Sequence, residues 1–139
     1  MDGYRLVRRQ EVEFRDLDGL GHVNNAVYLS YLESAKVAYF RDVAGAGDLA
    51  ELGIVADVKI AYRSPAFFGE TLEVGVRVRD VGMKSIVFEF ELRGADGRLV
   101  AEASSVHVTF DYATREPVPV PDEWRRRIDA HEAQSLATT

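Results

Sequence analysis

The sequence predicts an α+β fold in which one long helix packs against a curved antiparallel sheet of about five strands. Residues 26–43 carry apolar side chains around most of a helical circumference, which indicates a helix covered on most sides. The segment 54–111 instead contains four runs in which apolar and polar residues alternate, separated by short turns. Short turns join antiparallel strands, and an antiparallel sheet with a helix on one face is an α+β layer architecture.

The chain begins with a strand that leads into a polar loop. Leu6–Phe14 alternates, with Val12 and Phe14 on one side and two glutamates on the other, which predicts a strand. Asp, Gly and Asn residues then break the pattern over residues 16–25, which is typical of a loop. The loop therefore connects the first strand to the start of the helix.

The helix has recognisable signals at both ends. Asn24 or Asn25 is the expected N-cap, and the glycines of Gly45-Ala46-Gly47 end the helix. Glu33 lies on its narrow polar side, where Lys36 at i+3 is a partner for an ion pair. We therefore expect the helix to lie inside the molecule, with one narrow side in solvent.

Four strands follow the helix, with turns at residues 68–70, 81–83 and 95–97. Alternation gives each strand one apolar face, and those faces are expected to cover the helix. A single curved sheet leaves two edge strands, which favours edge-to-edge pairing of two copies. The residues expected on the apolar faces are Val58, Ile60, Tyr62, Leu72, Val74, Val76, Val78, Ile86, Phe88, Phe90, Leu92, Val106, Val108 and Phe110.

The C-terminal part of the chain has a different pattern. Three prolines in residues 117–121 stop strand formation, and a short helix is expected over Asp122–Ala133. Residues 134–139 are expected to be a tail. The chain is therefore interpreted as one domain over residues 1–133.

Composition excludes several classes of protein. The 139 residues are 47% hydrophobic and 29% charged, which is ordinary for a globular domain. The absence of cysteine excludes thiol nucleophiles, disulfide scaffolds and zinc ribbons. A net charge of −6 argues against nucleic acid as a partner. No apolar run is long enough to span a bilayer, and Met1–Arg5 is unlike a signal peptide, so we expect no membrane segment and a cytoplasmic location.

Metal and cofactor motifs are not recognisable either. His22, His107 and His131 are far apart in sequence and lack the spacing of metal ligands, so no metal and no cofactor is expected. His107 is expected at a surface or edge position, opposite the valines of its strand. The sequence also lacks the glycine patterns that bind dinucleotides or nucleoside triphosphates, and it lacks a serine nucleophile elbow.

The densest group of reactive side chains lies in the loop before the helix. Two carboxylates, a histidine and two amides occur within residues 14–25. The N–H groups of a first helical turn are unpaired and carry the positive end of the helix dipole, so they can polarise a carbonyl group. A nearby carboxylate could attack that carbonyl or activate a water. Loops and N-caps also contain Asp, Gly and Asn for structural reasons alone, and composition does not decide between these interpretations.

The residues of this loop resemble a known family signature. The pattern D-x-D-x-x-G-H-V-N-N-x-x-Y-L over Asp16–Leu29 is similar to that of the hotdog-fold acyl-CoA thioesterases, in particular the 4-hydroxybenzoyl-CoA thioesterase-like family. Ile60–Ala66, followed by Gly69-Glu70, resembles the second-strand motif of that family. The likeness extends from Val12 to about Pro121. It implies a hotdog fold, and assembly into a homodimer or homotetramer with active sites at the subunit interface.

The resemblance also implies roles for individual residues. Asp18 matches the catalytic aspartate, as nucleophile on the thioester carbon or as general base for water. The backbone N–H of Asn25 matches the group that polarises the thioester carbonyl. Gly21 and His22 shape the same loop, with His22 in a supporting role. Asp16 is expected to stabilise the loop.

Substrate contacts follow from the same resemblance. Coenzyme A is expected on the surface, with its phosphates near Lys84 and Ser85 and, as a weaker candidate, Arg63. Ser64 belongs to the second-strand motif beside Arg63. Tyr28 is a candidate for lining the acyl pocket. The implied partner is an acyl thioester of coenzyme A or of an acyl carrier protein.

Two other functions remain open from the sequence. The same fold could bind acyl thioesters without catalysis, although the intact Asp18 and the loop glycines argue against it. A hotdog hydratase or dehydratase is the other alternative, because such enzymes use a histidine near the helix and His22 lies there. Neither the acyl group nor the carrier follows from the sequence.

Overall fold

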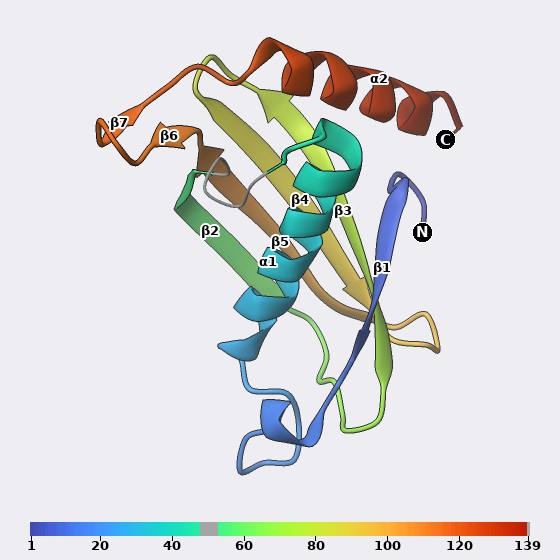
Figure 1. The fold of residues 1–139 in the computed structure, drawn as a ribbon. Helices are drawn as coiled ribbons and strands as arrows, with labels where there is room; N and C mark the ends of the chain where they lie inside the picture. Colours follow the sequence, from blue (N-terminus) through green and yellow to red (C-terminus); the bar gives the residue numbers. More distant parts are fainter. Residues whose placement is uncertain (48–52, 139) are drawn as a thin grey trace.

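The computed structural model describes residues 1–47 and 53–138 and has the expected α+β architecture. A five-stranded antiparallel sheet in the order β1-β3-β4-β5-β2 is crossed on one face by helix α1 (Figure 1). The elements are β1 Leu6–Glu11, α1 Val27–Tyr39, β2 Ile54–Tyr62, β3 Thr71–Val81, β4 Ser85–Arg93, β5 Leu99–Val108, β6 Phe110–Asp111, β7 Glu116–Pro117 and α2 Asp122–Thr138.

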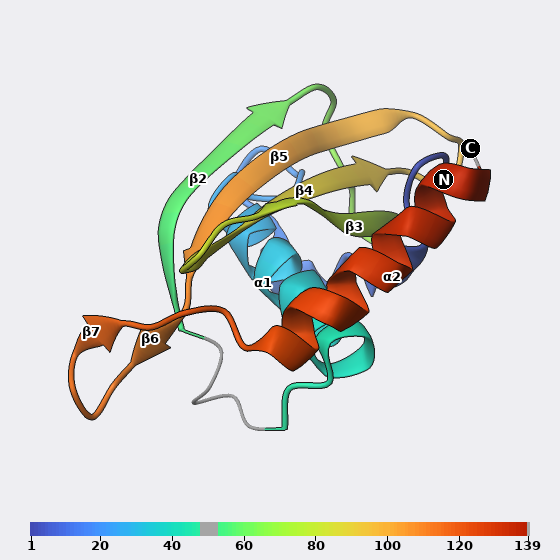
Figure 2. The same cartoon turned by 90° about the horizontal axis from the view of Figure 1, so that it is seen from above.

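The sheet curves around α1, as Figure 2 shows from above. Irregularities in register at Val55/Asp57 and at Val78/Asp80 accompany the curvature, since bulges increase the local twist and bend of a strand. The apolar faces of β3 and β4 are buried as the alternation predicts. The strands β1 and β2 form the two open edges of the sheet.

Helix α1 lies in the concave face of the sheet and is extended by a wider π-helical turn, Phe40–Ala44. Gly45 ends this turn with φ +77°, a left-handed conformation that favours glycine. The predicted ion pair is confirmed, with Lys36 Nζ at 2.8 Å from Glu33 Oε1. Lys36 is only 3% exposed, so its ammonium group is inside the protein and Glu33 compensates its charge.

The first strand ends earlier than the sequence predicts. It stops at Glu11, and Phe14–Asp16 form a single 3-10 turn. Val12 is buried, but Phe14 is 77% exposed and does not face the core. The turn replaces the strand because the Glu13 N–H bonds to the Asp16 side chain, a local contact that competes with strand pairing.

The inner face of β5 was predicted wrongly. Ser105 and His107 face the core and are 4% and 3% exposed, whereas Val106 and Val108 are only partly buried. His107 is therefore not at the surface: its ring lies 4.9 Å from that of Phe40. Alternation separates the two faces of a strand, but it does not say which face is buried. In β5 the face with Ser105 and His107 packs under the helix.

Helix α2 begins at Asp122, as expected, and runs to Thr138, beyond the predicted end at Ala133. The sequence 122–138 contains neither glycine nor proline to stop it earlier. The helix covers the end of α1, where the Tyr39 hydroxyl donates to Glu132 Oε2 at 2.5 Å. The same carboxylate accepts the Val78 N–H at 2.9 Å, which joins α2 to β3.

Candidate active site

Asp16 holds the loop between β1 and α1 in place. Its Oδ2 accepts hydrogen bonds from the Tyr31 hydroxyl at 2.7 Å and from the Glu13 N–H at 3.0 Å. Its backbone carbonyl accepts the Asn24 N–H at 2.9 Å. Burial, with the contact to Asp16, raises the pKa of Tyr31, so the phenol stays protonated as the donor. Asp16 therefore stabilises the loop, as the sequence suggests.

A second segment of the chain pairs with this loop. The Val23 N–H donates to the Ala66 carbonyl at 2.9 Å, and His22 forms a bridge with Phe67. Glu70 Oε1 accepts the Phe67 N–H at 3.0 Å, which fixes this segment from the other side. The candidate site is therefore built from two segments that are distant in sequence.

Arg98 secures the second segment, a role that sequence reasoning missed. Its guanidinium donates to Glu70 Oε2 at 2.6 Å, to the Pro65 carbonyl at 3.0 Å and to Ser64 Oγ at 3.2 Å. Ser64 Oγ in turn donates to the Leu99 carbonyl at 2.6 Å. Ser64 thus serves the framework of the site through Arg98.

Asp18 lies within a tight turn of the loop. Its Oδ1 accepts the Leu20 N–H at 2.8 Å, and its own N–H donates to the His22 carbonyl at 2.9 Å. Its Oδ2 lies 3.6 Å from His22 Nδ1. The Asp18 side chain is 26% exposed, and Gly21 closes the turn with φ +86°. One oxygen is thus fixed by the backbone and the other is available for chemistry.

The start of α1 adjoins this turn. The N-cap of α1 is Ala26, without a side-chain cap, so the prediction of Asn24 or Asn25 as the N-cap is wrong. Asn24 instead forms a turn before the helix, in which its Oδ1 accepts the Ala26 N–H at 2.9 Å. Within the described residues, the Asn25 N–H has no internal hydrogen-bond acceptor. The Asn25 carbonyl accepts the Tyr62 hydroxyl at 2.9 Å, which ties β2 to the helix start. This end of the helix can therefore donate a hydrogen bond to a carbonyl oxygen.

The predicted substrate residues separate into two groups. Tyr28, 3% exposed, packs against Tyr62 beside the helix start, and burial raises the pKa of its phenol. Arg63 follows β2 at the same end, in an ion pair with Glu102 at 2.7 Å. Lys84 and Ser85 instead lie at the β3–β4 turn, at the opposite end of the sheet (Figure 1). One chain does not bring them to Asp18.

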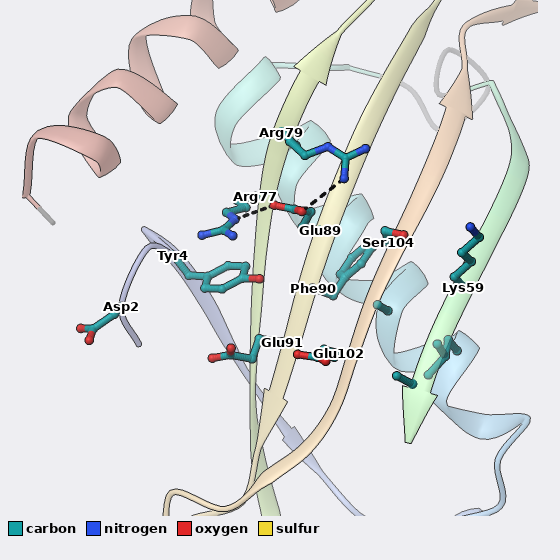
Figure 3. Close-up of a pocket in the computed structure, with 13 residues that line it drawn as sticks. Asp2, Tyr4, Lys59, Arg77, Arg79, Glu89, Phe90, Glu91, Glu102 and Ser104 are labelled. Carbon is teal, nitrogen blue, oxygen red and sulfur yellow. Dashed lines mark hydrogen bonds and ion pairs between the residues drawn. The ribbon is translucent and has the colours of Figure 1, made fainter. Parts of the chain in front are cut away.

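A cavity of about 490 Å³ on the other face of the sheet has a different character (Figure 3). Arg77 and Arg79 line this cavity, and each forms an ion pair with Glu89, at 3.0 and 3.5 Å respectively. The Arg77 guanidinium also lies 4.4 Å from the centre of the Tyr4 ring. This hollow lies on the opposite face of the sheet from α1, and both of its arginines are paired with Glu89.

Residues 1–47 and 53–138 contain neither a cluster of metal-ligating side chains nor a helix that could span a membrane. Among these residues, no three His, Cys, Asp or Glu side chains are grouped closely enough to hold a metal ion. No helix in the same ranges is sufficiently long and apolar to cross a membrane.

A helix wrapped by a curved antiparallel sheet, with a polar turn at the N-terminal end of the helix, defines a hotdog-fold protein. A family model described as the thioesterase-like superfamily matches residues 12–128. The chain belongs to this superfamily.

Individual relatives cover most of the chain. The crystal structure of a thioesterase from Thermus thermophilus, complexed with coenzyme A and Zn, has a TM-score of 0.87 and 37% identity, over 96% of this chain and 98% of that one. The long-chain acyl-CoA thioesterase FadM of Escherichia coli (strain K12) is 27% identical over 117 residues, 81% of this chain and 89% of FadM. YneP of Bacillus subtilis (strain 168) is 28% identical over 112 residues, 78% of this chain and 81% of YneP.

Proposed function

We propose that this protein hydrolyses acyl-CoA thioesters to a free acid and coenzyme A, with Asp18 as the reacting side chain. The observation that carries the proposal is the position of Asp18 Oδ2, partly buried beside His22 in the turn that leads into α1. The family and the activity named for FadM support a CoA thioester as substrate.

The backbone at the start of α1 supplies the electrophilic half of the reaction. The Asn25 N–H donates a hydrogen bond to the thioester carbonyl, and the helix dipole adds positive potential there. Negative charge develops on that oxygen when the carbonyl carbon is attacked, so the hydrogen bond strengthens in the transition state. Gly21 shapes the turn, and His22 orients Asp18 as a positioning residue.

Asp18 Oδ2 supplies the nucleophilic half by one of two routes. As a nucleophile it attacks the carbonyl carbon, the C–S bond breaks, and water then hydrolyses the resulting anhydride. As a general base it takes a proton from the attacking water and passes it to the departing sulfur, which yields the CoA thiol. A single turnover in H₂¹⁸O separates the routes, because only the nucleophilic route can leave ¹⁸O in the Asp18 carboxyl group.

Replacement of the carboxylate tests the proposal. We expect Asp18→Asn to lower kcat for acyl-CoA hydrolysis by roughly 10²–10⁴-fold, because the amide neither attacks nor accepts the proton. Release of free CoA thiol over a panel of acyl-CoAs is the measurement. Glu73→Gln, an exposed carboxylate on β3, is the control and should retain full activity. Equal rates for wild type and Asp18→Asn would remove Asp18 from the mechanism.

We propose coenzyme A, and not an acyl carrier protein, as the carrier. Acyl carrier proteins are acidic, and a chain with a net charge of −6 repels an acidic partner. Parallel assays with one acyl group on both carriers should give the higher kcat/KM on coenzyme A. A preference for the protein carrier would overturn this assignment.

We also propose that two copies pair through β2. This strand is an open edge of the sheet, and it exposes Ile54, Val55, Val58 and Tyr62 at 38–45%. An apolar open edge favours strand pairing with another chain. Assembly into a dimer or a tetramer would also allow Lys84 and Ser85 of one copy to reach the Asp18 site of another copy.

A further inference from the structure

A small apolar cavity lies between α1 and β2 on the inner face of the sheet. Its volume is about 260 Å³, below the roughly 300–1,000 Å³ of pockets that hold whole drug-sized ligands. It therefore has room for an acyl group but not for coenzyme A as well. Its lining residues are Leu29, Leu32, Glu33, Val55, Val58, Phe90 and Ser105.

Ser105 is the unusual member of this lining. It is 4% exposed, and within the described part of the chain its Oγ has no hydrogen-bond partner. It lies opposite Val58 on β2 and Phe88 on β4, on the face of the sheet that covers α1. A buried hydroxyl without a partner is unfavourable. A ligand in the cavity would supply the partner that the protein lacks.

The cavity adjoins the carbonyl site proposed above. Its helical residues, Leu29 to Glu33, lie within the first two turns of α1, up to about 9 Å from the helix start. The Tyr62 hydroxyl joins β2 to the Asn25 carbonyl at that same start. A thioester whose carbonyl oxygen lies at the Asn25 N–H can therefore extend its acyl group along the contact of α1 and β2 toward Ser105.

We infer that the cavity binds the acyl group and that Ser105 Oγ bonds to an uncharged oxygen on it, a hydroxyl or a ketone. This inference rests on the proposed function. A serine hydroxyl both donates and accepts, so it suits either group. A carboxylate does not fit, because the lining is apolar apart from Ser105 and Glu33, and the carboxylate of Glu33 already occupies the Lys36 ammonium group at 2.8 Å. The preferred substrates are therefore oxygenated acyl-CoAs of modest size.

Paired substrates test the role of Ser105. We would measure kcat/KM for hexanoyl-CoA and for hexanoyl-CoAs that carry one hydroxyl at successive carbons. The wild type should prefer one hydroxylated isomer, and Ser105→Ala should lower that preference by about tenfold, the value of one hydrogen bond. Ser104→Ala is the matched control, because Ser104 points to the cavity of Figure 3 on the other face and should leave the ratio unchanged.

A loss of stability should not account for a changed substrate preference in Ser105→Ala. Ser105→Ala removes an unsatisfied hydroxyl, so its unfolding midpoint should equal or exceed that of the wild type. An unchanged ratio in a folded Ser105→Ala enzyme overturns the inference and leaves the proposed function intact.

Binding to Asp18→Asn, measured by calorimetry with the same thioesters, separates the two proposals. If the wild type turns over none of them, but Ser105→Ala weakens binding of the hydroxylated isomer, the hydrolysis proposal fails and the cavity assignment holds. Equal binding of hydroxylated and plain thioesters in that background overturns the cavity assignment.

Discussion

Tyr31 connects the buried face of α1 to the loop that carries Asp18. Its hydroxyl bonds to Asp16, and Asp16 in turn holds the Glu13 and Asn24 backbone. A single side chain in the helix therefore determines where the loop lies. Asp18, two residues after Asp16, depends on this contact for its position.

Removal of the Tyr31 hydroxyl should be costly for stability. We expect Tyr31→Phe to lower the free energy of unfolding by about 1.5–3 kcal/mol, because the bond is made to a charged acceptor. Urea denaturation measures the change. Tyr112→Phe is the matched control: its hydroxyl bonds to the Gly53 carbonyl at an exposed site, so its effect should stay within about 0.5 kcal/mol. Similar losses in both variants would contradict a special role for Tyr31.

His107 makes stability depend on pH. Burial, with a smaller effect of Lys36, lowers its pKa to about 4, whereas in the unfolded chain the imidazole titrates near 6.5. Between those values the unfolded chain binds more protons, so the free energy of unfolding decreases as the pH falls. The loss from this residue should be on the order of 3 kcal/mol by pH 4.

Urea denaturation of wild type and His107→Leu between pH 4 and 7.5 measures that contribution. The difference between the two curves should change mainly between pH 6.5 and 4, because carboxylates titrate alike in both proteins. Parallel curves would show that the imidazole does not titrate differently in the folded protein.

At the scale of elements, the site depends on a junction that no single element forms. Arg98, just before β5, donates to Glu70, to the Ser64 hydroxyl and to the Pro65 carbonyl. Glu70 in turn fixes Phe67 beside His22. The ion pair is partly buried, with side-chain exposures of 30% and 17%. Its loss would release the segment that pairs with the loop that carries Asp18.

Arg98→Met tests this junction, since it keeps the aliphatic stem and removes the charge. We expect unfolding to become easier by about 1–3 kcal/mol, between the values of exposed and buried pairs. Thioester hydrolysis should fall with it, because the loop loses its support. Arg93→Met, which breaks the pair with Glu91 away from the loop, should affect stability less and spare hydrolysis. Full activity in Arg98→Met would contradict a positioning role.

Elements with one clear hydrophobic period were predictable from the sequence. The inner faces of β3 and β4 and the long helix follow directly from alternation and from the broad apolar circumference. In β5 both faces carry apolar and polar residues. The prediction therefore placed Val106 and Val108 on the inner face, where the structure has Ser105 and His107. Periodicity measures only hydrophobicity, and it misses a polar face that lies under a helix.

The sequence predicted which loop carries the candidate site, but not the contacts of that loop with the rest of the chain. The loop around Asp18 was recognised from its dense polar residues, and the roles of Asp18 and Asp16 were expectations from the resemblance to the thioesterase family. Arg98 and Tyr62 were missed because each acts across 28 or more residues of chain on a partner that only the fold brings near. Ser105 was missed because its cavity is formed by residues of α1, β2 and β4 that are distant in sequence. No local pattern marks such contacts.

For the whole molecule, the open edge of β2 sets the expected assembly. Ile54→Lys should shift the protein toward single chains, because each copy would place an unpaired charge in the apolar interface of the strand pair. Sedimentation velocity at several concentrations measures the shift. Gln10→Lys on the opposite edge strand, β1, is the control and should leave the mass unchanged. A mass unaffected by Ile54→Lys would move the interface away from β2.

The strand β2 is an open edge of the sheet, and through Val55 and Val58 it also lines the small cavity. If two copies pair through β2 as proposed, occupancy of the cavity and association of subunits are linked equilibria. A ligand that favours the paired arrangement must tighten pairing by the same factor by which pairing tightens its own affinity. Dilution of the protein should consequently raise the apparent KM.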